Sequence, residues 1–212
     1  MIFVRKNKKN KKDNFWIGFS DLMTGLMLVF IILSLTFMAI AKEKLDEIQQ
    51  QRKSVIVILS EKLASNNIKV EYDSEKGTVT IAQDILFIKK KADLNSKGQD
   101  FIKLFARILD QNIFSIEEYK DLIKYIHIEG YASKEGSPEY NFLLSFKRAQ
   151  NVWFYMTNKE LKNSDIMKRK LNIVSRGEIE ANQKFIDESD RKVIFRFEFY
   201  DTYNKIFEGL SK

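Results

Sequence analysis

A single carboxylate interrupts the most apolar stretch of this sequence. Residues 15–41 have the sequence FWIGFSDLMTGLMLVFIILSLTFMAIA, in which Asp21 is the one ionisable side chain. Burying a carboxylate in hydrocarbon costs about 2.5–3.5 kcal/mol on insertion scales, and desolvation favours its neutral, protonated form. Ionisation then needs a water path, which is the behaviour of a site that takes up and releases a proton. The alternative is an interfacial residue that reaches toward water on the near side of the membrane.

Small and polar residues share the helical face of Asp21. Gly18, Asp21, Thr24 and Gly25 are spaced three, three and one apart, and Leu28 continues the face. Small residues allow a second helix to approach closely, and a threonine hydroxyl can hydrogen-bond across the contact. This face therefore predicts a partner helix within the membrane.

A second polar group follows a strand end further along the chain. The run 128-IEGYASKEGSPEYNFLLSFKRAQNVWFYM-156 contains that strand end, a glycine-containing loop, and a helix with Asn141, Ser145 and Arg148. Such a loop and helix start can form a concave pocket that presents a cation to an anionic ligand. The alternative is that Arg148 only pairs with a carboxylate of a nearby helix or loop.

The composition suits one membrane span and one domain of ordinary size. The chain has 212 residues, of which 44% are hydrophobic and 31% charged, and it has one Pro and no Cys. The absence of Cys excludes a disulfide scaffold and a thiolate metal site or nucleophile. Redox chemistry is therefore not expected.

The basic character of the chain is concentrated in its first residues. Residues 1–14 contain six basic side chains against one acidic side chain, a local +5 out of a total of +7. A basic cluster just before a long apolar run places the N-terminus in the cytoplasm and everything after residue 41 outside it. We therefore expect an anchoring tail, with nucleic-acid binding by the tail as the alternative and no nucleic-acid groove elsewhere.

The apolar run is long enough to remain as a membrane anchor. From Phe15 to Ala41 a helix spans roughly 40 Å, more than a hydrocarbon core of about 30 Å. Asp21 lies only about 9 Å beyond Phe15, in the cytoplasmic third of the span. Residues 39–41, Ala-Ile-Ala, look like a signal-peptide cleavage site, but signal cores have only about 7–15 residues. We expect a retained single span.

Residues 42–67 become polar and then show apolar positions at helical spacing. The first half, through Arg52, is predicted to continue the membrane helix, and an amphipathic segment with Val55, Ile56 and Leu59 follows. Asn66 and Asn67 are expected to end it. Two explanations remain open for its apolar stripe, namely pairing with a second copy and packing on the following domain.

From residue 68 strands alternate with helices. The pattern predicts a hairpin at 68–83, helices at 95–111 and 141–159, and strands at 125–131, 171–175 and 191–199. Strands interleaved with helices require crossovers, so we expect an α+β domain with helices on one face of a mixed sheet.

No constellation for catalysis or metal binding is found. The lone His127 lies between Ile126 and Ile128 in a strand and is expected to point to the face opposite the core. The sequence contains no second His and no Cys, and we find no nucleophile with a base and no phosphate loop. We expect no enzyme, no metal and no cofactor.

The membrane segment resembles that of the MotB-type stator subunits of ion-driven motors. In that family an Asp, followed by an aromatic residue or Leu and then Met-Thr, carries the transported proton, and residues 21–24, DLMT, match it within 18-GFSDLMTGLMLVF-30. With Trp16, Phe19 and Ser20 before it, the segment looks most like the B subunit of the Zorya anti-phage defence motor. The resemblance implies Asp21 and Thr24 as ion-binding residues, with proton as the default ion and sodium as the alternative.

This resemblance also implies partners and a task. A single helix encloses no ion path, so a multi-span MotA-like subunit must surround it, and the family implies five such subunits around a homodimer of this chain. The implied task is rotation that signals phage infection to cytoplasmic effectors. Flagellar or other MotB-type energising and a passive tether to the cell wall are the alternatives, and ExbD/TolR-type energising is disfavoured because its outer domain lacks the Gly-loop-Asn-Arg pattern seen here.

The remainder of the chain resembles the OmpA-like peptidoglycan-binding domain. In that domain a strand that ends in Gly leads to a polar loop and then to Asn, Leu-Ser and Arg-Ala, as in 128–156, and the segments 85–109 and 187–197 fit the same domain. The resemblance implies that Asn141 and Arg148 line the pocket for the peptide stem, with Arg191 before the last strand.

One position departs from the family pattern. The family usually has Thr-Asp where this chain has Ala132-Ser133, so the carboxylate expected to pair with a ligand ammonium is absent. Ser133 can hydrogen-bond but cannot form a charge-assisted pair, so we expect weaker binding of a diaminopimelate stem or a different ligand, unless Glu135 substitutes for the carboxylate.

Together these patterns predict an inner-membrane protein with its C-terminal domain in the periplasm. The candidate peptidoglycan-binding residues are Ser133, Asn141, Arg148 and Arg191. The expected parts are a basic cytoplasmic tail at 1–14, a transmembrane helix at 15–41, a helical connector at 42–67, an OmpA-like domain at 68–200 and a C-terminal tail at 201–212.

Overall fold

The computed structural model describes residues 11–68, 70–88, 91–157 and 161–200. These belong to two compact units, residues 1–47 and 48–212, and each unit is described by itself. The predicted tail at 201–212 and the first ten residues of the predicted basic tail lie outside the described residues.

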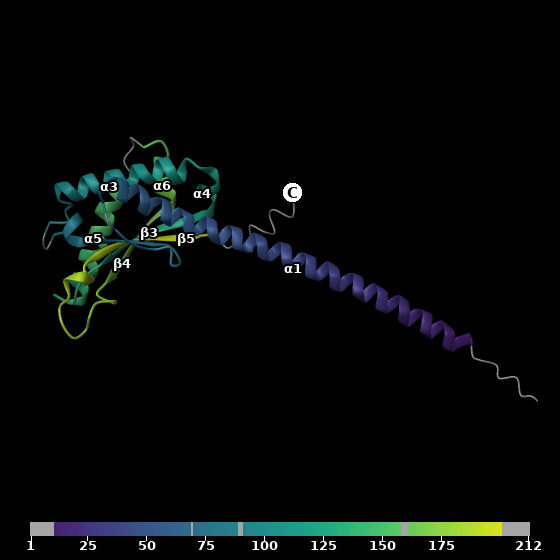
Figure 1. Ribbon diagram of the computed structural model, residues 1–212. Coiled ribbons are helices and arrows are strands. Elements are labelled where there is room, and N and C mark those ends of the chain that lie inside the picture. Colours follow the sequence, from purple (N-terminus) through teal and green to yellow (C-terminus); the bar gives the residue numbers. More distant parts are fainter. Residues whose placement is uncertain (1–10, 69, 89–90, 158–160, 201–212) are drawn as a thin grey trace, which may run out of the picture. The chain divides into compact units, whose positions relative to one another are not determined.

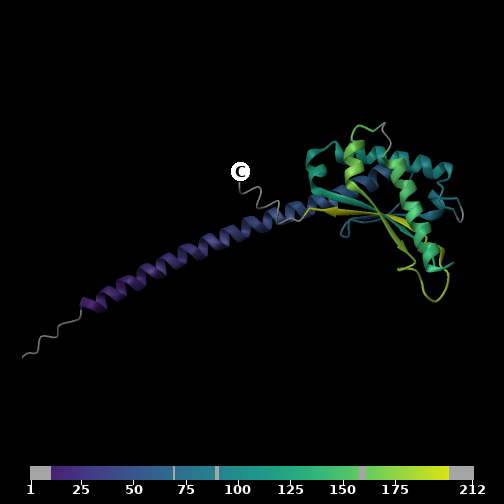
Figure 2. The same ribbon diagram turned by 180° about the vertical axis from the view of Figure 1, so that it is seen from behind.

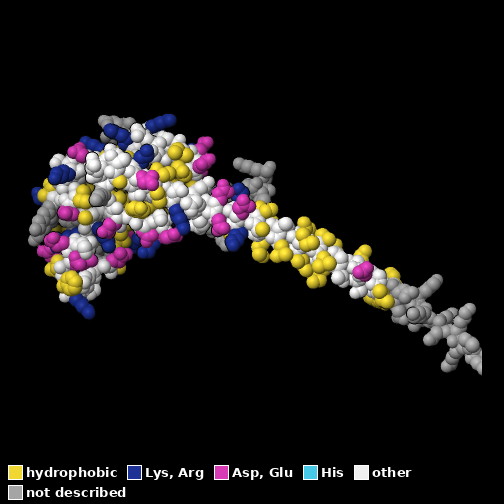
Figure 3. Space-filling model, viewed as in Figure 1, with side chains coloured by type: hydrophobic (Ala, Val, Ile, Leu, Met, Phe, Trp, Pro, Cys, Tyr) yellow, Lys and Arg dark blue, Asp and Glu magenta, His cyan; other side chains and the backbone are white. Residues whose placement is uncertain are grey.

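Helix α1 (Lys11–Ser65) contains the predicted membrane segment. In the described residues it is the one helix long and apolar enough to cross a membrane, with a mean hydropathy of 2.4 over its most apolar 18 residues. Its side chains from 15 to 40 are exposed, and Figure 3 shows hydrophobic groups covering this part of the helix. The helix continues without a break through the polar residues that follow, as expected. It ends at Ser65, and Asn67 adopts a positive φ of 60°, which Asn tolerates better than most residues.

The last turns of α1 are part of the second unit. Val55, Ile56, Leu59 and Leu63 are fully buried in its hydrophobic core. Of the two explanations left open for this apolar stripe, packing on the following domain is therefore the one that the structure supports.

A five-stranded mixed sheet forms the centre of the second unit. The strand order is β1-β2-β5-β3-β4, with β3 and β4 parallel and the other neighbours antiparallel. The first two strands form the predicted hairpin, whose turn contains Gly77 at φ 66°. The strands are β1 (Glu71–Asp73), β2 (Thr78–Ala82), β3 (Ile123–Tyr131), β4 (Leu171–Gly177) and β5 (Lys192–Phe199).

Helices cover one face of this sheet, as Figures 1 and 2 show from opposite sides. The α-helices are α2 (Gln83–Leu86), α3 (Ser96–Leu109), α4 (Glu117–Leu122), α5 (Pro138–Met156) and α6 (Ser164–Lys170), with a π-helical turn η1 (Asp110–Phe114) and a 3-10 turn η2 (Glu188–Asp190). The predicted α+β class, with one long apolar helix and helices on one face of a mixed sheet, is confirmed.

Helix α5 begins three residues earlier than predicted. Ser137 caps it by accepting a hydrogen bond from the Tyr140 backbone N–H over 3.2 Å, and Pro138 occupies the first turn, where no N–H is needed. It ends at Met156 rather than at 159, and residues 158–160 lie outside the described residues.

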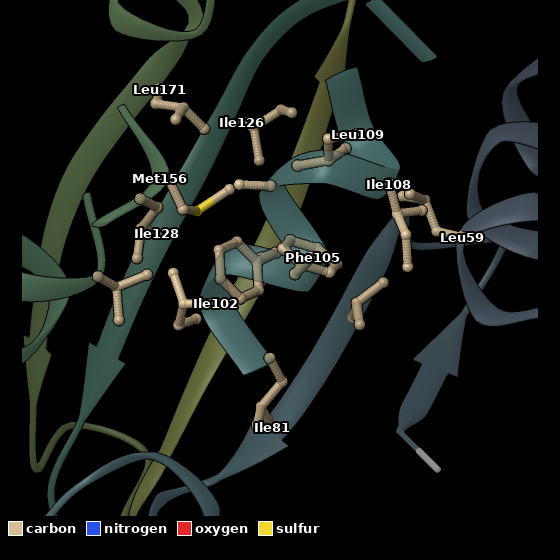
Figure 4. Close-up of a cluster of buried hydrophobic side chains, with 14 of the residues drawn as sticks. Leu59, Ile81, Ile102, Phe105, Ile108, Leu109, Ile126, Ile128, Met156 and Leu171 are labelled. Atoms are coloured by element: carbon tan, nitrogen blue, oxygen red, sulfur yellow. The ribbon is translucent and has the colours of Figure 1, made fainter. Parts of the chain in front are cut away.

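Apolar side chains from the helices meet the sheet in one core. Figure 4 shows Leu59 of α1, Phe105 of α3 and Ile126 of β3 among them. The Phe105 ring lies 4.5 Å from that of Phe195 of β5, centroid to centroid. His127 points to the opposite face, as predicted, where its Nε2 lies 2.9 Å from Glu198 Oε2.

The face of the sheet opposite this core contains a buried carboxylate that the sequence did not predict. Glu129 of β3 is 1% exposed and accepts hydrogen bonds from Arg176 (2.7 Å), Arg196 (3.0 Å to each oxygen) and the Tyr131 hydroxyl (2.8 Å). Burial by itself would raise the pKa of Glu129, but the hydrogen bonds from Arg196, Arg176 and Tyr131 outweigh it and lower this pKa to about 2. The cluster ties three neighbouring strands together.

Candidate functional site

The order of the strands brings three loops to one edge of the sheet. Because β3 and β4 are parallel, their carboxyl ends lie at the same edge, and β5, which is antiparallel to β3, begins there. Ser133 follows β3, Glu178 follows β4 and Arg191 precedes β5. Residues that are distant in the sequence therefore meet at this edge, beside the start of α5.

Helix α5 approaches β3 closely at Gly130. A methyl group at this position would come within 2.2 Å of the Ser145 carbonyl oxygen, so only glycine fits. The Ser145 hydroxyl is fully buried, lies 2.6 Å from that of Ser175 and accepts a hydrogen bond from the Gly177 backbone over 3.1 Å. These contacts of Ser145 fix the orientation of α5 against the sheet. Asn141 and Arg148 lie four residues before and three residues after Ser145, so they share its face of the helix.

The four predicted peptidoglycan-binding residues line one pocket of about 180 Å³. Ser133, Asn141, Arg148 and Arg191 come to it from the β3–α5 loop, from α5 and from the residue before β5. The structure thus brings together all four, and their role in binding stays a prediction. The other lining residues are Ala132, Glu135, Gly136, Tyr140 and Leu144.

Arg148 is a buried cation at the wall of this pocket. It is 3% exposed, its Nε donates to the Lys91 carbonyl oxygen over 3.1 Å, and its guanidinium carbon lies 5.3 Å from the centroid of the Phe87 ring. Burial, together with the nearby charge of Arg191, lowers the pKa of Arg148 to about 10, so the side chain stays charged at neutral pH.

No carboxylate in the described parts of the chain forms an ion pair with Arg148. The alternative that this side chain only pairs with a helix or loop carboxylate is therefore not what the structure shows. A buried cation is costly without a counter-charge, and an anionic ligand in the pocket would supply one.

Arg191 is already engaged on three sides. Its Nε donates to the Ser133 hydroxyl over 2.9 Å, and its two terminal nitrogens donate to Glu135 Oε2 over 2.5 Å and to Glu188 Oε1 over 3.4 Å. Glu135 thus places a carboxylate in the pocket, as suggested above, but this carboxylate pairs with Arg191.

Asn141 is oriented by a residue that the sequence did not indicate. Its Nδ2 donates to Glu178 Oε2 over 2.5 Å, and Asn141 itself is 1% exposed. Glu178 stands directly after Gly177, at the end of a strand parallel to β3. This position could have indicated Glu178 as a residue of the site, because the carboxyl ends of parallel strands lie at the same edge of a sheet.

The predicted ion-binding residues lie one turn apart on α1. The Thr24 hydroxyl donates to the Ser20 carbonyl oxygen of the preceding turn over 2.8 Å. Asp21 is exposed, and methyl groups added at Gly18 or Gly25 would meet nothing within 4 Å. All side chains of residues 15–40 are exposed in this way, so a partner helix on the face of Asp21 stays a prediction. Among the described residues, no group of three or more His, Asp or Glu side chains is arranged to hold a metal ion.

Comparison with protein-family models matches residues 86–193 to the OmpA family, a segment that contains β3, α5 and the whole pocket. The chain belongs to the OmpA family. In the solved structures, the OmpA domain resembles that of a MotB-like protein from Desulfovibrio vulgaris, with a TM-score of 0.50 at 15% identity over 76% of this chain and 97% of the other. This likeness concerns the fold.

Two curated relatives extend the similarity beyond the OmpA domain. The Zorya protein ZorB of Escherichia coli O139:H28 is 25% identical over 95% of this chain and 87% of its own length. ZorB of Escherichia coli ATCC 8739 is 27% identical over 60% of this chain and 57% of its own length. The chain thus has an OmpA domain and is similar to ZorB, and the one apolar helix found in its described residues fits a single-pass inner-membrane protein.

Proposed function

We propose that this chain is the wall-anchored stator subunit of a proton-driven motor of the inner membrane, acting in anti-phage defence. The observation that carries the proposal is the extent of the similarity to ZorB, which covers 95% of the chain and so includes both α1 and the OmpA domain. One chain then joins a membrane carboxylate, Asp21, to a domain with an anion pocket.

In this proposal the OmpA domain holds the cell wall. Arg148 binds a carboxylate of the peptidoglycan stem peptide, because it is a buried cation without an ion pair in the described residues. Asn141, oriented by Glu178, and the Ser133 hydroxyl supply neutral hydrogen bonds. Arg191 completes the pocket while its charge is shared with Glu135.

The membrane part of the proposal rests on the solvation of Asp21. In this proposal Asp21 takes up a proton from a water path on one side of the membrane and releases it to a path on the other. A ring of MotA-like subunits, five around two copies of this chain, provides the alternating surroundings. Each proton that crosses about 100 mV supplies about 2.3 kcal/mol of work. The basic residues before the apolar segment orient the N-terminus to the cytoplasm and the OmpA domain to the periplasm.

The decisive experiment replaces Asp21 by Asn in cells that express the full chain with its multi-span partner. The motor proposal expects loss of protection against phage and of proton flux, with co-purification of the partner unchanged. Ser34→Ala, which removes a polar group of similar size from a different face of the same helix, serves as the control and should leave both readouts intact.

The same experiment separates the second candidate, a passive tether between membrane and wall. A tether needs the pocket and the apolar helix but no ionisable group in the membrane, so it tolerates Asp21→Asn. Full protection with the Asn variant would therefore rule out the motor. A flagellar or other energising stator would lose its output with Asp21→Asn but would affect motility or transport instead of phage resistance.

A further inference from the structure

A second hollow adjoins the pocket that contains Arg148. It has a volume of about 510 Å³ and lies between residues 91–93 and α5. Tyr140 and Leu144 line both hollows, so the two form one continuous groove along the helix. We infer that the second hollow is a further subsite, which takes a second carboxylate of the same peptidoglycan stem peptide.

Two hydrogen bonds hold the far wall of this subsite in place. Arg148 Nε donates to the Lys91 carbonyl oxygen over 3.1 Å, and Asn151 Nδ2 donates to the Ala92 carbonyl oxygen over 2.8 Å. Arg148 therefore lines the first pocket and also fixes the segment that presents Lys91. A ligand that spans both subsites meets a surface whose geometry is already set, which reduces the entropic cost of binding.

The charge of the second subsite suits an anion. Lys91 and Lys147 are exposed at its rim, and Asp93 is the one acidic residue among the described residues that line it. In the described parts of the chain, none of the three forms a salt bridge. Two ammonium groups thus remain available to a ligand carboxylate.

The length of the groove matches a short peptide. From Tyr140 to Asn151 the helix rises about 16 Å, since each residue adds about 1.5 Å. An extended peptide of four residues reaches at most about 14 Å. A stem tetrapeptide carries several carboxylates along its length, so one at Arg148 leaves another within reach of Lys91 and Lys147.

This inference rests on the proposed binding of peptidoglycan. The experiment is designed so that failure of the second subsite can be distinguished from failure of peptidoglycan binding itself. The full chain, purified in detergent, is titrated with free diaminopimelate, with the stem tetrapeptide, and with a tetrapeptide amidated at every carboxylate outside its diaminopimelate residue. The variant is Lys91→Gln with Lys147→Gln. Its control is Lys97→Gln with Lys103→Gln, two exposed lysines of α3 that line neither hollow.

We expect the groove variant to bind the tetrapeptide about threefold to thirtyfold more weakly than wild type, as the loss of two exposed charge pairs implies. It should bind free diaminopimelate and the amidated peptide as wild type does, and the control should match wild type throughout. Equal affinity of variant and wild type for the tetrapeptide would overturn the second subsite while leaving the proposed function standing. An equal loss on free diaminopimelate would also overturn it. If wild type binds none of the three ligands, both proposals fail.

Discussion

Arg191 donates a hydrogen bond from its Nε to the hydroxyl oxygen of Ser133 over 2.9 Å. The domains that this chain resembles usually have an aspartate at the position of Ser133, whereas Ser133 is neutral and is 3% exposed. The pocket therefore contains the cations Arg148 and Arg191 but lacks the carboxylate of that aspartate. This difference leads to the first prediction.

Ser133→Asp should increase the affinity for free diaminopimelate about fivefold, because a carboxylate forms a charge-assisted hydrogen bond with a ligand ammonium and a hydroxyl does not. Calorimetric titration of the full chain measures the change. Ser133→Asn is the control of the same shape without the charge. A gain of equal size with Asn, or with a ligand whose amines are acetylated, would show that the charge is not the cause.

Arg148→Met should reduce binding to insoluble peptidoglycan by about tenfold to a hundredfold, the range expected for a lost charge-assisted contact. The thioether keeps much of the contact with the Phe87 ring, so the domain should remain folded. Co-sedimentation measures binding, and the thermal unfolding midpoint checks the fold. Arg107→Met, an exposed residue of α3, is the control. Unchanged sedimentation of the Arg148 variant would remove the pocket from wall binding.

Glu129 should make the second unit sensitive to acid. Its pKa in the folded chain is lowered from 4.5 to about 2, so the stability that it contributes is fully present above about pH 4.5 and is lost as the pH falls toward 2. The shift corresponds to about 3 kcal/mol. Denaturant unfolding at pH 6 and pH 3, followed by tryptophan fluorescence, measures this loss.

Glu129→Gln tests the assignment of that acid sensitivity. The variant should be about 3–5 kcal/mol less stable at pH 6, since it leaves Arg176 and Arg196 without their buried partner, and its stability should vary less between pH 6 and pH 3. Glu117→Gln, at an exposed site, should behave as wild type. An unchanged pH dependence in Glu129→Gln would assign the effect to other carboxyl groups.

Leu59→Ala should lower the free energy of unfolding of the second unit by about 2–5 kcal/mol, because the side chain is fully buried in its core. The loss should not depend on protein concentration. Denaturant unfolding at two concentrations tenfold apart measures both points, with the exposed Glu61→Ala as the control. A loss that grows on dilution would favour pairing between copies of this helix.

Local patterns predicted the elements that position the site. The alternation of β3, with Ile126 and Ile128 buried and His127 on the other face, follows from the period of a strand. The predicted start of α5 is three residues late, although Ser137 and Pro138 form a recognisable helix start. The pocket residues Asn141 and Arg148 were indicated by the strand end, loop and helix of residues 128–156 and by the resemblance of that run to OmpA-like domains.

The side-chain contacts that were not predicted connect neighbouring strands. They depend on the register between those strands, which local sequence patterns do not specify. Glu129 meets Arg176 of β4 and Arg196 of β5 only because these strands flank β3 in a particular alignment. Short helices such as α4 and α6 were also not predicted, because segments of six or seven residues form through tertiary packing more than through local preference. Glu178 belongs with them, since its contact with Asn141 depends on how two loops meet.

The close approach of Gly130 to Ser145 leaves room for a hydrogen atom and for nothing larger. A side chain at this strand position would push the helix backbone outward, and Asn141 and Arg148 would move with it. The shape of the pocket that these two residues line thus depends on a glycine that lies behind the helix and does not line the pocket itself.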